Sequence, residues 1–453
     1  MAKMLHKPTT FRTIETRFGI YAVLKAKIRM IDMKKTCIAL IGALALLSGC
    51  KKIDDPVVPL DQLTERRDFT LTRTDLDFIR ANNGFAFDLF KRVVAKEDGK
   101  STLISPLSVT VDFGMVDNGA VGATRDEINR VLGFEGSLED FNAFCRSMLV
   151  LSAAVDPSTT LNIANAAVVN KSCVPLKSGF TKTIESVYDA EVIYKVFGKD
   201  DVMGLINSWC NEKTNGMIPR LLDSQPLPSE YAHFLNAVYF KGIWCSKFDK
   251  NDTKKESFTR EDGNRTSVQM MWQRNKFNVG GIGDVCRTLC LPYGNQAYRM
   301  IILLPNEGKT IGDVKEALNA ESWDAMVKKM GGNCEVDVKL PVFETETPVL
   351  SLREALIGMG IRNAFGLDGD ADFSAMSDGS LCISDVIQKA RIKVDETGSE
   401  AAAVTDIITG YFSAGPGNNE PQVIQFHCDH PFLYAITEVS SGAIYFIGQY
   451  TGK

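Results

Sequence analysis

Residues 396–409 read ETGSEAAAVTDIIT, a stretch that alternates like a buried strand and runs into a segment typical of a loop. Every odd-numbered position from Ser399 onward carries a small or apolar residue, whereas the charged residues Glu400 and Asp406 occupy even positions. Because successive side chains of a strand point to opposite faces, this pattern predicts a strand with one face against a core. The GPG triplet at 415–417 then indicates an exposed loop. The stretch is therefore a candidate for moving between an exposed and a buried state.

The rest of the chain predicts an α+β fold. Helical spacing of apolar residues predicts a first helix over 76–94 with Asp75 as its N-cap, a second after Ser105, and a third over 202–215. From about Phe234 the pattern changes, and strands are expected at 238–240, 300–304, 336–340, 433–436 and 443–447. The predicted helices come first in the chain and the mostly antiparallel strands come later, without strand–helix alternation. This order favours the α+β class.

Composition limits the function. The chain has 453 residues, 45% of them hydrophobic, which is enough for a large core. It carries 51 Lys and Arg against 56 Asp and Glu and has no long basic run, so nucleic acid is not an expected partner. No internal repeat or low-complexity linker divides the chain, which favours one large domain.

The N-terminus resembles a bacterial lipoprotein signal. Lys34 and Lys35 follow Met33, an apolar run over 37–47 is too short to span a bilayer, and LSGC ends at Cys50. The resemblance to a lipobox implies a diacylglycerol on Cys50. We therefore expect 1–49 to be an extension and signal peptide with Met33 as the true start, and 50–70 to be a lipidated tether. The expected location is the outer membrane, on its periplasmic or cell-surface face. The alternative is a plain signal peptide in which Cys50 is incidental.

The chain shows no pattern expected of an enzyme or a metal site. Nucleophile elbows, phosphate-binding loops and dinucleotide fingerprints are absent from the sequence. His427, Cys428 and His430 lie close together, but on a strand the two histidines would point to opposite faces. Nine cysteines follow Cys50, an odd number, so at least one is unpaired in a monomer, and we expect most of them to be buried thiols.

Ordered motifs along the chain resemble the serpin family of serine protease inhibitors. They stand at 104–108, 118–120, 206–218, 235–242, 371–374 and 429–433. The resemblance implies an α+β serpin fold over 71–453 with three β-sheets, about eight or nine helices, and an exposed reactive centre loop at about 396–425.

The resemblance also assigns residues to roles. The hinge of the loop would be Glu396, Gly398, Ser399, Glu400, Ala401, Ala402 and Ala403. Family spacing, sixteen positions after Glu396, places the reactive bond between Phe412 and Ser413. The alternatives are cleavage at Tyr411 or at a later bond, or an aromatic pair that only packs the loop. The sheet-opening region would comprise Ser105, Ser108, Asn236, Trp244 and Gln388. Gln388 stands where many members carry a histidine, and an amide can likewise donate and accept hydrogen bonds.

The implied function is inhibition of a protease by a suicide mechanism, in which the cleaved loop inserts into the large sheet. An aromatic residue at the reactive bond suits a chymotrypsin-like serine protease as the partner. A monomer without a cofactor is expected. The alternatives are a non-inhibitory serpin that acts as a binding, storage or chaperone-like lipoprotein, an inhibitor of papain-like cysteine proteases, and an unrelated surface lipoprotein.

Overall fold

The computed structural model describes residues 66–97, 99–152, 154–369, 371–399 and 423–453. These residues belong to one unit of the chain, 57–453. Three sheets and nine α-helices are described within it. None of the helices in the described part is long and apolar enough to cross a membrane.

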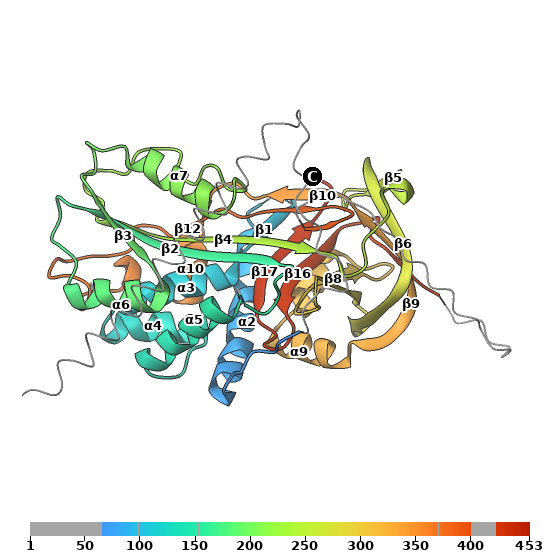
Figure 1. Cartoon of the computed structure of the whole chain (residues 1–453), viewed down its shortest axis with the longest axis horizontal. Coiled ribbons are helices and arrows are strands. Elements are labelled where there is room, and N and C mark those ends of the chain that lie inside the picture. The colour runs from blue at the N-terminus through green and yellow to red at the C-terminus, as the bar shows by residue number, and fades with distance from the viewer. Residues whose placement is uncertain (1–65, 98, 153, 370, 400–422) are drawn as a thin grey trace, which may run out of the picture. The chain divides into compact units, whose positions relative to one another are not determined.

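A six-stranded sheet passes through the middle of the unit (Figure 1). Its order is β10 (Phe343–Glu346), β13 (Arg391–Val394), β14 (Gly398–Ser399), β4 (Ala232–Ile243), β2 (Thr160–Asn170) and β3 (Glu191–Lys195). All its pairings are antiparallel except β2 with β3. The two-residue strand β14 therefore separates the long strand β4 from β13.

A nine-stranded sheet forms the other half of the unit. Its order is β1 (Thr102–Ile104), β17 (Ile444–Tyr450), β16 (Phe432–Glu438), β8 (Tyr298–Pro305), β7 (Cys286–Pro292), β6 (Arg265–Ile282), β9 (Gly331–Pro341) and β15 (Ile424–His427), and β5 (Lys254–Thr259) pairs with β6. A third, two-stranded sheet joins β11 (Leu350–Ser351) to β12 (Ile387–Gln388).

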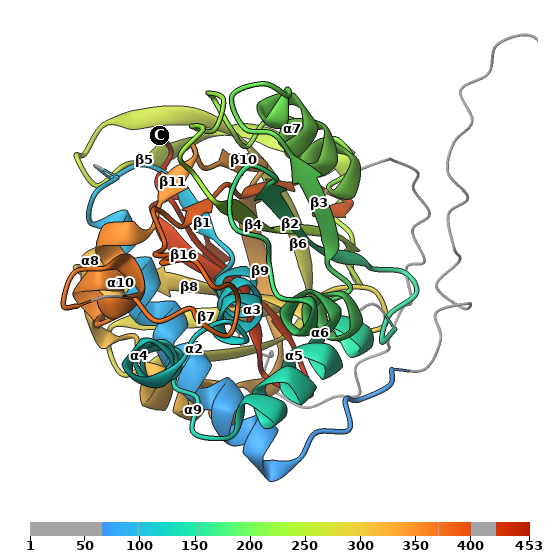
Figure 2. The ribbon, with the colours of Figure 1, turned by 90° about the vertical axis from the view of Figure 1, so that its left-hand side faces the viewer.

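Helices cover both faces of the six-stranded sheet. Figures 1 and 2 show α7 (Val202–Lys213) on one face and α3 (Pro106–Asp117), α5 (Leu138–Ser152) and α6 (Ser178–Tyr188) on the other. The remaining helices are α2 (Arg73–Val94), α4 (Gly122–Leu132), α8 (Ile311–Ala317), α9 (Ala320–Lys329) and α10 (Arg353–Met359), with 3₁₀ turns η2 (Lys250–Asp252) and η3 (Asn363–Phe365). Nearly every residue of α3 is buried, since it runs through the core rather than along its surface.

Two hydrophobic cores follow from this arrangement. The larger lies between the sheets and the helices around α3. The smaller lies on the opposite face of the six-stranded sheet, where Ile206 and Trp209 of α7 pack against Leu235 and Ala237 of β4. Odd-numbered residues of this part of β4 therefore face α7, and even-numbered residues face α3.

The structure confirms the α+β class, and the five expected strands correspond to β4, β8, β9, β16 and β17, of which β17 begins at Ile444 rather than 443. The first helix begins at Arg73 rather than 76, and its N-cap is Thr72 rather than Asp75. The N–H of Asp75 donates to Thr72 Oγ1 at 3.1 Å, and Asp75 Oδ2 accepts from the Thr72 N–H at 2.8 Å. Asp75 is thus the N3 residue of a capping box, and its carboxylate accepts a hydrogen bond there as an N-cap side chain would.

The expectation of no strand–helix alternation is wrong in one place. Strand β2, helix α6 and strand β3 form a crossover whose two strands are parallel. The second half of β2 is buried on both faces, between α7 and the core, so it shows no period-two pattern. This burial is why the sequence did not indicate the strand.

Candidate functional site: the hinge and the strand gap

The structure places part of the expected hinge inside the six-stranded sheet. Gly398 pairs with Ile243 of β4, and Ser399 pairs with Gly242 of β4 on one side and Val394 of β13 on the other. The remaining hinge residues Glu400, Ala401, Ala402 and Ala403, the expected reactive bond Phe412–Ser413, and Cys50 lie outside the described residues.

A tight turn leads from β13 into β14. The Asp395 N–H donates to the Gly398 carbonyl at 2.9 Å, and the Gly398 N–H donates back to the Asp395 carbonyl at 3.2 Å. The Asp395 carboxylate accepts from the Thr397 N–H at 2.9 Å, which satisfies a donor inside the turn. A Cβ at Gly398 would lie 2.0 Å from the carbonyl oxygen of Gly242, so this close approach to β4 requires glycine.

The side chain of Ser399 lies in a buried aromatic cluster. Its side chain is buried, with Oγ 2.7 Å from the Tyr293 hydroxyl oxygen. The Tyr293 ring stacks on Trp244 at 4.4 Å between centroids, and Trp244 Nε1 donates to the Asp395 carbonyl at 2.9 Å. Burial raises the pKa of Tyr293, so its hydroxyl stays protonated and available as a hydrogen-bond partner for Ser399.

Glu396 is held by the segment that follows β4. Its carboxylate accepts from Thr253 Oγ1 at 2.7 Å, and its carbonyl accepts from the Phe248 N–H at 3.0 Å. The adjacent Thr397 carbonyl accepts from the Trp244 N–H at 2.8 Å. The turn is therefore bonded through its backbone to residues that follow β4, which fixes where the next strand starts.

Cavities lie between β4 and the segment that leads into β13. Within the described residues, β4 and β13 share no ladder pairing. A small cavity lined by residues 234–237 and 387–389 lies between them, and a larger one of about 390 Å³ is lined by 230–235 and 381–387. We call this line of cavities between β4 and the 381–394 segment the strand gap.

Ser105, Ser108 and Gln388 meet beneath the strand gap. Gln388 Oε1 accepts from the Ser105 N–H at 3.0 Å, and its Nε2 donates to the Ser105 carbonyl at 2.8 Å. Ser105 Oγ donates to the Tyr445 carbonyl at 2.8 Å and caps α3 by accepting from the Ser108 N–H at 3.4 Å. The amide of Gln388 thus joins its strand to the start of α3 through both a donor and an acceptor.

Asn236 lines the same cavity as Ser108 and Gln388. Its Nδ2 donates to Asn165 Oδ1 at 2.6 Å, and Asn165 in turn donates to the Tyr188 carbonyl. Asn236 Oδ1 is shielded from solvent and has no hydrogen-bond partner among the described residues. Trp244, by contrast, lies with the hinge, so the expected sheet-opening residues divide between two clusters.

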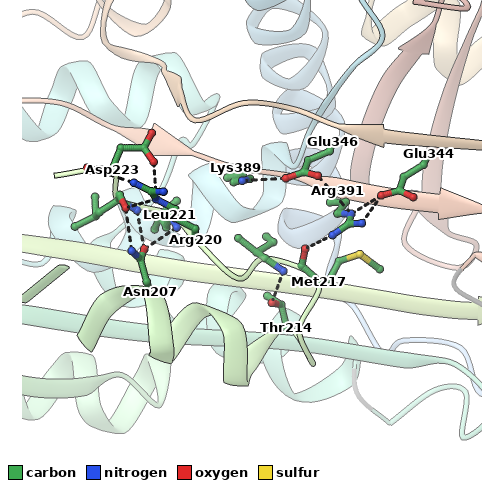
Figure 3. Close-up of polar contacts among 12 residues, drawn as sticks. Asn207, Thr214, Met217, Arg220, Leu221, Asp223, Glu344, Glu346, Lys389 and Arg391 are labelled. Atoms are coloured by element: carbon green, nitrogen blue, oxygen red, sulfur yellow. Dashed lines mark hydrogen bonds and ion pairs between the residues drawn. The ribbon is translucent and has the colours of Figure 1, made fainter. Parts of the chain in front are cut away.

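A covering segment formed by α7 and residues 214–223 crosses the strand gap on its outer face (Figure 3). Asn207 Oδ1 accepts from the N–H groups of Leu221 and Leu222 at 2.7 and 2.8 Å. Arg391 of β13 donates to the Met217 carbonyl at 3.4 Å and to Glu344 at 2.6 Å. Within the covering segment, residues 221 and 222 are thus bonded to α7, and Met217 is bonded to β13.

Sequence reasoning missed Tyr293, Asp395 and Arg391. Tyr293 reaches Ser399 across 106 residues of chain, and Arg391 reaches Met217 across 174. The one available signal is that Arg391 precedes the buried Ile392, which places the arginine on the outer face of β13. Its partner is the backbone carbonyl of Met217, and because every residue has such a carbonyl, the sequence cannot identify the partner.

The histidines and cysteines that the sequence singled out do not form a common site among the described residues. His427 lies 3.1 Å from Asp337, and His430 lies 2.8 Å from Asp429, each in a separate contact. The nine cysteines after Cys50 are free thiols; Cys382 is exposed and five are buried, Cys286 and Cys290 among them. No group of residues in the described part is arranged to hold a metal ion.

Comparisons with known proteins agree with this architecture. The model of the family Serpin (serine protease inhibitor) matches residues 80–452. Serpin B6 of Macaca fascicularis is 33% identical over 378 residues, which cover 82% of this chain and 98% of that protein. An uncharacterised serpin-like protein of Methanosarcina acetivorans is 30% identical over 423 residues, which cover 92% of this chain and 97% of that protein.

Solved structures show the same fold. The thermophilic serpin tengpin in its native state has a TM-score of 0.74 at 27% identity, covering 86% of this chain and 98% of its own. Thyroxine-binding globulin in complex with thyroxine has a TM-score of 0.72 at 25% identity, covering 82% of this chain and 98% of its own. The chain belongs to the serpin family.

Proposed function

We propose that this serpin is a suicide inhibitor of chymotrypsin-like serine proteases, and that its cleaved loop fills the strand gap. One observation carries the proposal: Gly398 and Ser399 already form the first two residues of a strand between β4 and β13. Beyond them the described strands on either side are unpaired with each other. Two described residues of the hinge thus lie in the sheet position that the cleaved loop would extend along the strand gap.

The register of β14 says where each loop residue would go. Ser399 stands opposite Gly242 and Val394, and each step along an antiparallel strand moves one residue back on both neighbours. Thr405 would then stand opposite Asn236 and Gln388. Its hydroxyl, on the same face as the buried Ser399, supplies the donor that Asn236 Oδ1 lacks.

The energy of insertion supports the mechanism. About a dozen new strand residues at roughly 1 kcal/mol per net hydrogen bond give on the order of 10 kcal/mol. This is comparable to the free energy of unfolding of a whole protease domain. An insertion energy of this order supports the deformation of a protease that stays attached to the loop.

The chemistry needs no catalytic group from the serpin. The protease serine attacks the carbonyl carbon of Phe412, an ester forms, the peptide bond to Ser413 breaks, and the new amine leaves. If insertion moves the esterified protease before water reaches the ester, the reaction stops at the acyl-enzyme. The aromatic ring of Phe412 suits the apolar specificity pocket of chymotrypsin.

A denaturing gel after incubation with chymotrypsin tests the proposal. We expect a detergent-resistant complex at the summed mass and a released peptide that begins at Ser413. Ser399→Arg would place a charge in the buried cluster at Tyr293, so this variant should be cleaved without forming the complex. Normal inhibition by the variant would contradict the insertion mechanism, and a complex with papain but not chymotrypsin would contradict the target class.

Phe412→Arg tests the position of the reactive bond. A cationic residue there favours the acidic specificity pocket of trypsin over the apolar pocket of chymotrypsin. We expect the rate of complex formation to fall with chymotrypsin and rise with trypsin, each by at least tenfold. Unchanged rates with both proteases would place the reactive bond elsewhere in the loop.

For the location, we propose attachment to a membrane through a lipid on Cys50, on the strength of the LSGC sequence that ends there. The mass of the N-terminal peptide of the mature protein tests this proposal. A diacylglyceryl cysteine at position 50, absent from the Cys50→Ser variant, is the expected result. A mature chain that begins elsewhere with an unmodified Cys50 would contradict it.

A further inference from the structure

The larger cavity of the strand gap, of about 390 Å³, has the size of a small-molecule site. It lies between α3, the start of β4 and the segment before β12. Its apolar walls include Phe113, Val116, Phe234, Leu381 and Ile387. Such a volume bounded by apolar side chains with a few polar groups is typical of a ligand pocket.

One polar group in this cavity lacks a partner. Asp112, on α3, lines the cavity, and its Oδ1 is shielded from solvent without a hydrogen-bond partner among the described residues. Burial raises the pKa of Asp112 well above its usual range. Asp112 as a residue is half-buried, but a shielded carboxyl oxygen without a hydrogen bond is costly, and the neighbours of Asp112 on α3 are mostly apolar.

The charges around the cavity favour a cation. Asp112, Glu230 and Asp385 are its acidic residues, and no lysine or arginine lines it. Glu230 is already bonded to His233 at 2.9 Å, and burial lowers the pKa of His233, which favours its neutral form. Asp385 accepts from Ser351 Oγ and from the Val386 N–H, both at 2.7 Å. Asp112 is thus the acidic group left for a ligand.

We propose that this cavity binds a small organic cation, an amine with an apolar body, whose ammonium group pairs with Asp112. The ammonium would supply the donor that Oδ1 lacks, and a charge-assisted hydrogen bond of this kind is about twice as strong as a neutral one. The apolar body would lie against Phe113, Phe234 and Leu381. Binding also releases the proton of Asp112, because a nearby cation favours the ionised carboxylate.

The position of the cavity links this site to the loop, a step that rests on the proposed function. In the register of β14, residue 407 of the inserted strand stands opposite Phe234 and Val386, and residue 409 stands opposite Ala232 and Ser384. All four of these residues line the cavity. The amine and the inserted strand therefore exclude each other, so a bound amine should favour cleavage without complex formation.

Calorimetric titration of the full chain tests the site without any protease. The probes are 4-phenylbutylamine, the neutral 4-phenylbutanol and the anionic 4-phenylbutyrate, which share one apolar body. We expect the amine to bind at least tenfold tighter than the alcohol, the anion to show no binding, and the heat to depend on the buffer because a proton is released. Asp112→Asn should weaken amine binding at least tenfold.

Asp117→Asn is the matched control, since Asp117 is the other carboxyl residue of α3, is buried, and does not line the cavity. Its amine affinity should equal that of the unaltered chain. If Asp112→Asn does not fold, Ser384→Trp fills the cavity from an exposed lining position and should abolish binding of the amine. Absence of amine binding, equal affinity for amine and alcohol, or binding retained by either variant would overturn the proposal.

A second measurement distinguishes the amine site itself from its competition with the inserted loop. If the chain inhibits chymotrypsin, saturating amine should raise the number of serpin molecules consumed per protease inhibited at least twofold. An unchanged number would overturn the competition between amine and loop. If the chain inhibits no protease, the proposed function fails, while the amine affinity and its dependence on Asp112 still decide the site.

Discussion

Among single residues, Asn236 beneath the strand gap carries a shielded side-chain oxygen that has no hydrogen-bond partner among the described residues. In the proposed insertion, the register of β14 would bring Thr405 opposite Asn236. Thr405→Val keeps the shape of the side chain and removes the hydroxyl. We expect the cleaved form to lose about 1–2 kcal/mol of unfolding free energy while the uncleaved form is unchanged.

Chemical denaturation of the cleaved and uncleaved forms measures this difference. Thr405→Ser, which keeps the hydroxyl, is the control and should retain the hydrogen bond. Equal losses in the cleaved and uncleaved forms of Thr405→Val would show that the hydroxyl has a role before insertion, and the assigned register would be wrong.

Asp117 predicts a pH dependence of stability. Its carboxyl is fully buried, Arg125 Nε lies 3.7 Å from Oδ1, and burial raises its pKa to about 7. The folded chain therefore holds a proton that the unfolded chain loses near pH 4. The free energy of unfolding should fall as pH rises from about 4 to about 7, by about 4 kcal/mol at most from this group.

Asp117→Asn should remove this fall and make the variant more stable than the unaltered chain at pH 8. Thermal unfolding midpoints at pH 5 and pH 8 measure both effects. A variant that is less stable at pH 8 would mean that the ion pair with Arg125 outweighs the cost of burying the charge.

At the scale of elements, the covering segment over the strand gap has to give way before a strand can enter. Arg391 joins β13 to the Met217 carbonyl of this segment and to Glu344 of β10. Arg391→Gln should remove the contact with Met217, lower the unfolding free energy by about 1 kcal/mol, and speed insertion after cleavage.

Tryptophan fluorescence can follow insertion, since Trp244 contacts the hinge turn directly. Lys393→Gln is the control, because Lys393 is the next outward-facing residue of β13 and is exposed. Insertion that is no faster in Arg391→Gln than in Lys393→Gln would show that this contact does not restrain the covering segment.

Elements also show what the sequence could and could not predict. Alternation from Ser399 onward predicted a core-facing serine, and the structure buries Ser399, because period-two patterning remains legible where only one face of a strand meets a core. Strand β2 was not predicted because its second half is covered on both faces. Tyr293 and Asp112 depend on contacts between distant segments, so no local pattern marks them.

For the whole molecule, the proposed insertion would extend β14, of which the structure describes Gly398 and Ser399, into a full-length strand of the six-stranded sheet. Cleavage of the loop should add this strand and raise the thermal unfolding midpoint, because about a dozen residues gain strand hydrogen bonds on both sides. A rise of at least 10 °C is expected for a stabilisation on the order of 10 kcal/mol in a chain of this size. An unchanged midpoint after cleavage would indicate a loop that stays outside the sheet.

Hydrogen exchange of backbone amides before and after loop cleavage tests insertion most directly. The amides to follow lie on the two sides of the strand gap, at 232–241 of β4 and at 386–394 through β12 and β13. If the loop becomes the strand between them, exchange should slow at least a hundredfold on both sides after cleavage, and Ser399→Arg should prevent the slowing. Unchanged exchange on both sides of the gap in a fully cleaved chain would contradict insertion.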